Sequence, residues 1–329
     1  MKKTVFMFPG LGSQYYHMGK ELYENINSFN AWMNKLDEIA EEINGYSIIS
    51  EVYNAEKDMF DLFDQLLYTS PAIFMAEYTM AQVLIDYGIT PDYVLGTSVG
   101  EMASAAVAGI ISPEDALETI ITNAKYIEST CERGAMIAVL EDASFFENTP
   151  VLYNNSELAA LNFDTHIVVA CRKDKSKVIA DFLDDMSVIY QELPVTYGFH
   201  SSLIDPADPV NRNYTAGISR KASAVPLISC IDGEIRTRLP DRFFWDICRE
   251  PIRFSETIEK TEIKNNNQLV YVDLGPGGTL ANFAKRNLQP YSKSEVYPIM
   301  TMFNYDLKNF NKVLDAFRHE IIKERAFGF

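Results

Sequence analysis

The chain has 329 residues, of which 47% are hydrophobic and 23% charged, a composition typical of a globular protein with a sizeable core. Its formal net charge of −17 argues against nucleic acid and anionic membrane surfaces as partners. The four cysteines follow no metal-ligand or CxxC spacing. We therefore expect reduced, mostly buried thiols in a cytoplasmic protein without a metal site.

The N-terminal third predicts strands that alternate with helices. Residues 4–10 form a short apolar run that ends at Pro-Gly, which favours a buried strand over a secretory signal. Helical apolar spacing follows over 71–88, and residues 91–96 form a second short strand. Ser112 and Pro113 are typical of the beginning of a helix. This order indicates an α/β architecture with a largely parallel sheet, and no segment reaches the length of a membrane span.

The middle of the chain follows a different order. Strands are predicted over 134–142 and 166–171, a helix over 174–186, and a third strand over 189–195. This succession predicts a small α+β insert, after which the main domain resumes near residue 197.

Three further elements are predicted after the insert. They are a helical segment over 243–260 that is interrupted at Pro251, a buried strand that begins at Leu269 and leads into a glycine turn, and an amphipathic helix over 307–324. The sequence has no internal repeats and no low-complexity segments.

A Gly-x-Ser-x-Gly pattern at residues 96–100 stands between a predicted strand and a predicted helix. A nucleophilic serine needs a sharp strand-to-helix turn, small flanking residues and a backbone N–H that faces the developing oxyanion. The pattern supplies all three and predicts that Ser98 is a nucleophile. The alternative is a tight turn with a structural serine.

A serine nucleophile also needs a base, and the chain has four histidines: His17, His166, His200 and His319. His200 is predicted at the end of a strand, where an α/β fold gathers its site residues. His319 falls on the polar face of the last predicted helix, where we expect it to be solvated. His200 is therefore the best candidate for the base.

Seven stretches of the sequence extend this assignment. In chain order they are FPGLGSQYYHMGKELY, GTSVGE, GAMIAV, LAALNFDTHIVVAC, YGFHSSLIDP, REPIRF and VDLGPGGTL. Together they resemble the motifs of the malonyl-CoA:acyl-carrier-protein transacylase family and of the related acyltransferase domains of polyketide synthases. Several motifs in the same order are far more specific than the serine pattern alone.

The resemblance implies an α/β fold, in which an α/β-hydrolase-like core with a parallel sheet carries an inserted ferredoxin-like α+β subdomain. Residues 1–132 and 198–329 would form the large catalytic subdomain, and residues 133–197 the small one. It also implies a monomer that acts on an acyl carrier protein, with acyl-CoA as an alternative acyl donor. No cofactor is expected, because the substrate itself carries the phosphopantetheine.

The resemblance further implies roles for matching positions. Ser98 would be acylated, and His200 would be its general base and then the acid for the leaving thiol. The backbone N–H groups of Leu11 and Val99 would form the oxyanion hole. A backbone carbonyl near Ile247 would orient the imidazole.

The selectivity positions of the family fall on Thr97, Asn123, Asn162, His166, Tyr197, Gly198 and Phe199. Asn123 stands where the family has an arginine that pairs with the malonyl carboxylate, and Thr97 stands where it has a histidine. An unpaired buried carboxylate costs several kcal/mol, so we expect a neutral pocket that suits acetyl or longer uncharged chains. Gly198 would widen this pocket. The alternative is that another arginine, such as Arg133, replaces the missing one.

Standalone relatives in trans-acyltransferase polyketide pathways lack this arginine and include proofreading acyl hydrolases. The resemblance therefore implies an acyl hydrolase in polyketide biosynthesis, which cleaves acyl-carrier-protein thioesters through a Ser98 acyl-enzyme and the base His200. One alternative is an acyltransferase that moves non-malonyl or malonyl groups onto the carrier protein. Another is an inactive carrier-binding scaffold, which the retention of both residues argues against.

Overall fold

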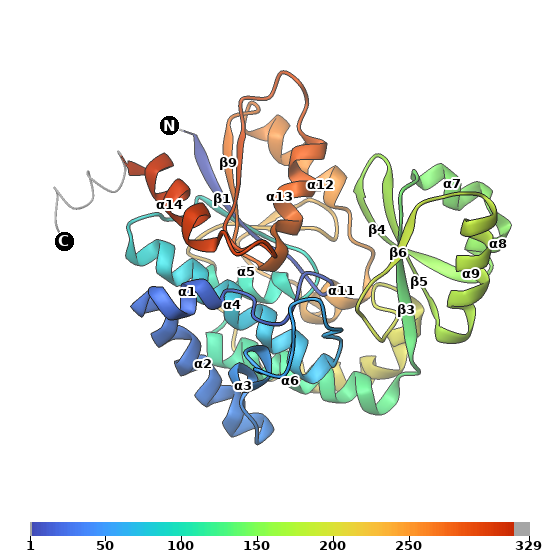
Figure 1. Cartoon of the computed structure of the whole chain (residues 1–329), viewed down its shortest axis with the longest axis horizontal. Helices are drawn as coiled ribbons and strands as arrows, with labels where there is room; N and C mark the ends of the chain where they lie inside the picture. The colour runs from blue at the N-terminus through green and yellow to red at the C-terminus, as the bar shows by residue number, and fades with distance from the viewer. Residues whose placement is uncertain (1, 319–329) are drawn as a thin grey trace.

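The computed structural model describes residues 2–318 and contains a six-stranded main sheet (Figure 1). Its strands are, in spatial order, β10 (Glu295–Pro298), β9 (Leu269–Asp273), β1 (Lys3–Phe8), β2 (Tyr93–Gly96), β7 (Leu227–Ser229) and β8 (Ile235–Arg236). All neighbours are parallel except β7 and β8. Phe8 pairs with Gly96, and Met7 pairs with Asp273. The loops after β1, β2 and β9 therefore leave the same edge of the sheet, where α/β folds place their sites.

Helices cover both faces of this sheet. Apart from those of the insert, they are α1 (Lys20–Asn25), α2 (Asn27–Asn44), α3 (Ile48–Val52), α4 (Leu66–Asp86), α5 (Gly100–Val107), α6 (Pro113–Thr130), α10 (Asp208–Thr215), α11 (Phe243–Arg249), α12 (Phe254–Lys264), α13 (Thr279–Asn287) and α14 (Asp306–Ala316), with 3₁₀ turns at Ser202–Ala207 and Pro276–Gly278. Strand alternation divides the core: Phe6 and Phe8 pack in one cluster with α2, α4, α5 and α6, whereas Val5 and Met7 pack in another with α12 and α13.

A second sheet of four antiparallel strands lies to one side of the main sheet (Figure 1). Its spatial order is β4 (Ser156–Phe163), β5 (His166–Arg172), β3 (Gly134–Val139) and β6 (Tyr190–Glu192), with the helices α7 (Ala143–Asn148), α8 (Pro150–Tyr153) and α9 (Lys173–Asp185). This order is that of a ferredoxin-like unit. The α/β class with a small antiparallel subdomain is thus confirmed, and all four strands lie within the expected insert.

Two backbone hydrogen bonds join the small subdomain to the main subdomain. Leu161 N donates to the carbonyl of Ile252 at 2.8 Å, and Ile252 N donates to the carbonyl of Ala159 at 2.9 Å. These two bonds form a parallel bridge between Ala160 in β4 and Ile252, which lies between α11 and α12.

The sequence predicted some helix ends correctly and others wrongly. α6 begins at Pro113, and the Ser112 hydroxyl accepts from Asp115 N at 3.0 Å, as the capping pattern predicts. α4 begins at Leu66, five residues before the expected start at Pro71. A proline near the beginning of a helix removes only one early hydrogen bond, so it does not mark the first residue. The last helix was expected to reach residue 324; α14 ends at Ala316, and residues 319–324 lie outside the described part.

The cysteines agree with the expectation of mostly buried thiols. All four cysteines are free thiols, three of them buried and Cys131 partly exposed. Among the helices of residues 2–318, each is too short or too polar to cross a lipid bilayer.

Candidate active site

Ser98 occupies the turn between β2 and α5 in a left-handed backbone conformation, with φ 53°. The two flanking glycines make this turn possible. A Cβ atom on Gly96 would lie 2.4 Å from Glu101 N, and one on Gly100 would lie 2.0 Å from the carbonyl oxygen of Phe8. No side chain fits at these distances, so the sequence pattern predicted the elbow for the right physical reason.

His200 reaches Ser98 from the other half of the main domain. Its Nε2 lies 3.0 Å from Ser98 Oγ, and its Nδ1 lies 2.8 Å from the carbonyl oxygen of Glu250. Because a carbonyl only accepts, Nδ1 carries the proton and Nε2 accepts from the Ser98 hydroxyl. Burial lowers the pKa of His200 to about 4, which keeps the imidazole neutral at pH 7, so that Nε2 can accept a proton.

The orienting carbonyl belongs to Glu250 and not to Ile247, so that expectation was wrong. Ile247 lies inside α11, whose carbonyls point along the helix axis. Glu250 caps this helix in an extended conformation, with φ −78° and ψ 148°, which turns its carbonyl out of the helix. The Ile247 side chain instead lines the apolar cavity described below.

The expected oxyanion donors lie beside Ser98. Val99 caps α5, and Leu11 lines the same cavities as Ser98. A Cβ on Gly10 would lie 2.7 Å from Ser98 Cβ, so the loop that carries Leu11 passes very close to the nucleophile. Within residues 2–318, neither the Leu11 N–H nor the Val99 N–H donates to a protein acceptor. Both remain available to a ligand, and their role stays a prediction.

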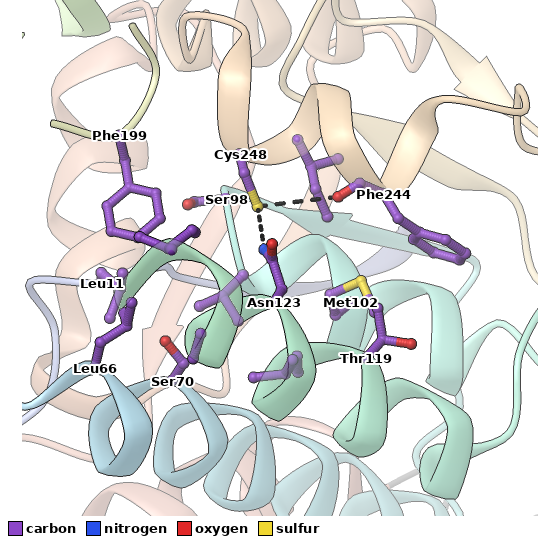
Figure 2. A pocket seen from close by; sticks show the side chains of 15 residues that line it. Leu11, Leu66, Ser70, Ser98, Met102, Thr119, Asn123, Phe199, Phe244 and Cys248 are labelled. Atoms are coloured by element: carbon purple, nitrogen blue, oxygen red, sulfur yellow. Dashed lines mark hydrogen bonds between the residues drawn. The ribbon is translucent and has the colours of Figure 1, made fainter. Parts of the chain in front are cut away.

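An apolar cavity of about 30 Å³ opens beside Ser98. Figure 2 shows the 15 residues that line it, from α4, α5, α6, α11 and the three loops that carry Leu11, Ser98 and Phe199, and none of them is charged. Asn123 is one of them. Its Oδ1 accepts from Asn211 Nδ2 at 2.9 Å, and its Nδ2 lies 3.6 Å from Cys248 Sγ. The arginine position of the family is thus a neutral amide that is bonded to its neighbours.

A larger cleft of about 310 Å³ lies on the other side of Ser98. Thr97, Asn162 and His166 face this cleft together with His200, and do not line the apolar cavity as expected. Asn162 Nδ2 lies 3.1 Å from His166 Nδ1, and this contact orients the His166 imidazole on the small sheet.

The three residues before His200 do not line the same cavity. Phe199 lines both the apolar cavity and the larger cleft. Gly198 lines neither, because a Cβ there would meet Leu203 Cδ1 at 2.5 Å, and so it cannot widen the pocket. Tyr197 lines a separate cleft near Arg133. The assignment of Tyr197 and Gly198 to the acyl pocket was therefore wrong. The suggestion that Arg133 replaces the missing arginine was also wrong, because Arg133 reaches neither cavity at Ser98.

Another histidine, His17, lies away from this site. His17 Nε2 lies 2.7 Å from the carbonyl of Lys57 and lines neither cavity. His319 lies outside the described residues. Within residues 2–318, no group of three or more His, Cys, Asp or Glu side chains is arranged to hold a metal ion.

Sequence reasoning missed most of the residues that shape the apolar cavity. They include Ser70, Met102, Phe244 and Cys248. Met102 lies four residues after Ser98, and this helical spacing was a usable signal. The others come from helices that meet only after folding, so no local pattern indicated them.

Known proteins resemble this chain both in sequence and in structure. The family model described as the acyl transferase domain matches residues 5–323. The chain is 42% identical to the polyketide biosynthesis acyltransferase homolog BaeD of Bacillus velezensis, over 95% of this chain and 96% of that protein. It is 41% identical to the polyketide biosynthesis acyltransferase homolog PksD of Bacillus subtilis, over 94% and 95% of the two chains.

A solved structure agrees with these relatives. The acyltransferase domain from the second module of the salinomycin polyketide synthase is similar with a TM-score of 0.83 and 25% identity, over 95% of this chain and 72% of that chain. The Ser98–His200 pair lies within the residues that the family model matches. The chain therefore belongs to the acyl transferase domain family.

Proposed function

We propose that this protein is a serine-dependent hydrolase of polyketide biosynthesis that releases uncharged acyl groups from acyl-carrier-protein thioesters. The observation that carries the proposal is the neutral, apolar cavity beside a bonded Ser98–His200 pair. The names of the two Bacillus relatives support the polyketide context.

The first half of the reaction forms an acyl-enzyme. Ser98 Oγ attacks the thioester carbonyl carbon while His200 Nε2 takes the hydroxyl proton. The N–H groups of Leu11 and Val99 would bind the oxyanion. The carbon–sulfur bond then breaks, and His200 returns its proton to the departing thiolate. The Glu250 carbonyl, bonded to Nδ1–H, holds the ring in place and stabilises the imidazolium.

The second half releases the acid. His200 takes a proton from water, the resulting hydroxide attacks the acyl ester, and Ser98 leaves with the proton that His200 returns. The larger cleft on the open side of Ser98 offers space for the phosphopantetheine arm first and for water after the thiol has left. The reaction requires no cofactor of the protein's own.

A malonyl group does not suit the apolar cavity. Its carboxylate would lie among uncharged side chains, with Asn123 already bonded to Asn211. A buried carboxylate without a cation loses several kcal/mol of binding energy. Acetyl and other short uncharged groups avoid this cost.

A transacylase for uncharged acyl groups is the second candidate. It differs from the hydrolase only in the nucleophile that resolves the acyl-enzyme, and a cleft of about 310 Å³ also admits a second thiol arm. An inactive scaffold is less well supported, because the hydrogen bond between Ser98 and His200 is in place.

The test loads separate carrier proteins with acetyl, butyryl and malonyl groups and follows the intact masses of carrier and enzyme. The hydrolase predicts free carrier and acid without an acceptor, and the transacylase predicts an adduct that moves to a second carrier. Ser98→Ala should abolish both, while Ser104→Ala, on the same elbow helix but outside both cavities, should behave like the wild type. Turnover by Ser98→Ala equal to that of the wild type would exclude both enzymes.

A further inference from the structure

The apolar cavity beside Ser98 contains few polar side chains, and most of them are already bonded within the protein. The Ser98 hydroxyl is bonded to His200. The Thr119 hydroxyl donates to the carbonyl of Asp115 at 2.6 Å. The Asn123 amide has partners on both its oxygen and its nitrogen. These three side chains therefore have little capacity left for hydrogen bonds with a ligand.

Ser70 is different. It lies on α4, one residue before Pro71, and its side chain lines the cavity next to Leu66 (Figure 2). The residue is only 5% exposed. Its hydroxyl makes no hydrogen bond with any of the residues 2–318. Because Ser70 lines the cavity, its hydroxyl is available to hydrogen-bond with whatever fills the cavity.

The surroundings of Ser70 restrict the chemistry of that ligand. The lining carries no charge, so the ligand group at Ser70 is neutral. A hydroxyl both donates and accepts, so it can bind either a hydroxyl or a keto oxygen. The free volume of about 30 Å³ is that of one or two water molecules, which restricts the acyl chain to a few carbons. The oxygen must therefore lie close to the thioester carbonyl.

We infer that Ser70 selects short acyl chains that carry a neutral oxygen at C3, as 3-hydroxyacyl or 3-oxoacyl groups, over the unsubstituted chain of the same length. This inference rests on the proposed function, because it requires that the chain in the cavity is the acyl group on Ser98. A site that offers a hydrogen bond discriminates against an analogue that lacks the matching group, since its own polar atom then stays unpaired. One neutral hydrogen bond corresponds to a preference of about fivefold to tenfold.

The experiment compares butyryl, 3-hydroxybutyryl and 3-oxobutyryl thioesters of N-acetylcysteamine with the full-length protein. The readout is kcat/KM for acylation of Ser98, followed as the mass of the acyl-enzyme, so hydrolysis and transfer need not be separated. The wild type should prefer the two oxygenated chains by about fivefold to tenfold. Ser70→Ala should lose this preference, because the oxygen at C3 then has no hydrogen-bond partner at this position.

Ser104→Ala is the matched control. Ser104 is a buried serine on α5 whose hydroxyl also lacks a partner among residues 2–318, but it lines neither cavity at Ser98. This variant should keep the wild-type preference. A wild type without preference would overturn the inference, and so would a Ser70→Ala variant that is slowed equally with all three chains or that keeps the preference. Acylation by none of the thioesters would instead overturn the proposed function on which the inference rests.

Discussion

His200 Nε2 and Ser98 Oγ lie 3.0 Å apart, and both residues adopt left-handed backbone conformations, with φ 59° and φ 53°. Such conformations are uncommon for residues other than glycine and cost on the order of 1 kcal/mol each. Surrounding contacts hold them, including the bond from His200 N to the carbonyl of Cys248 at 2.8 Å. The two side chains therefore already have the geometry that proton transfer from Ser98 to His200 requires.

The low pKa of His200 predicts an unusual pH profile. Burial lowers this pKa to about 4, and only the neutral imidazole can accept the Ser98 proton. The kcat/KM for Ser98 acylation by an uncharged thioester should stay constant from about pH 8 down to about pH 5 and fall about tenfold per pH unit below pH 4. Circular dichroism over the same range checks that the protein stays folded. A midpoint near the ordinary histidine value would contradict the prediction.

The neutral amide of Asn123 predicts the charge preference of the acyl pocket. The wild type should be acylated by acetyl thioesters at least about 100-fold faster than by malonyl thioesters, because a buried carboxylate finds no cation. Asn123→Arg should raise the malonyl-to-acetyl ratio by about tenfold or more by supplying a bidentate partner. Asn123→Gln is the control, since it keeps a neutral amide and should leave the ratio low. Faster acylation by malonyl than by acetyl in the wild type would refute the argument.

The elbow geometry predicts that Gly100 tolerates no side chain. A Cβ there would lie 2.0 Å from the carbonyl oxygen of Phe8, which is backbone of a central strand and cannot move aside. We expect Gly100→Ala to lower the free energy of unfolding by about 3 kcal/mol and to abolish acylation of Ser98. At Gly217 the nearest atom to a Cβ is 3.6 Å away, so Gly217→Ala should unfold like the wild type. Equal denaturation midpoints for the two variants would contradict the prediction, because they would show that β1, which carries Phe8, shifts to make room for the added methyl group.

The buried carboxyl group of Glu77 should make the protein less stable as the pH rises. Its carboxyl group is fully buried, both oxygens lack partners among residues 2–318, and burial, with nearby Asp273, raises its pKa well above 4.5. A raised carboxyl pKa means that folded-state stability is complete below the unfolded pKa and is lost as the pH rises toward the folded pKa.

Glu77→Gln removes this titration. The wild type should lose about 1.4 kcal/mol relative to Glu77→Gln for each pH unit between the two pKa values, as measured by denaturant unfolding. Glu42→Gln, at an exposed position, is the control and should follow the wild type at every pH. A constant difference between Glu77→Gln and the wild type from pH 5 to pH 9 would mean that Glu77 does not titrate in this range.

Local signals explain which parts of the fold were predictable. The beginning of α6 followed from Ser112 and Pro113, whose capping roles depend only on neighbouring residues. β4 was missed because its pairing with β5 shifts register between Leu158 and Ala160 and again between Leu161 and Phe163. Such irregularities break the alternation of apolar and polar residues by which a strand is recognised.

The same distinction holds at the site. Ser98 and His200 were found because side chains of these types in these patterns indicate their chemistry. The Glu250 carbonyl could not be found in this way, because a backbone group leaves no mark on residue identity. The lining of the apolar cavity depends on how α4, α5, α6 and α11 pack, and position in the sequence does not specify that packing.

The bridge between Ala160 and Ile252 has a mechanical consequence. Ile252 follows Glu250 by two residues, so β4 of the small sheet is tied almost directly to the carbonyl that orients His200. A rotation of the small subdomain would pull on this short tether and turn the imidazole away from Ser98. A partner that moved this subdomain would therefore disturb the alignment of the His200 imidazole with Ser98.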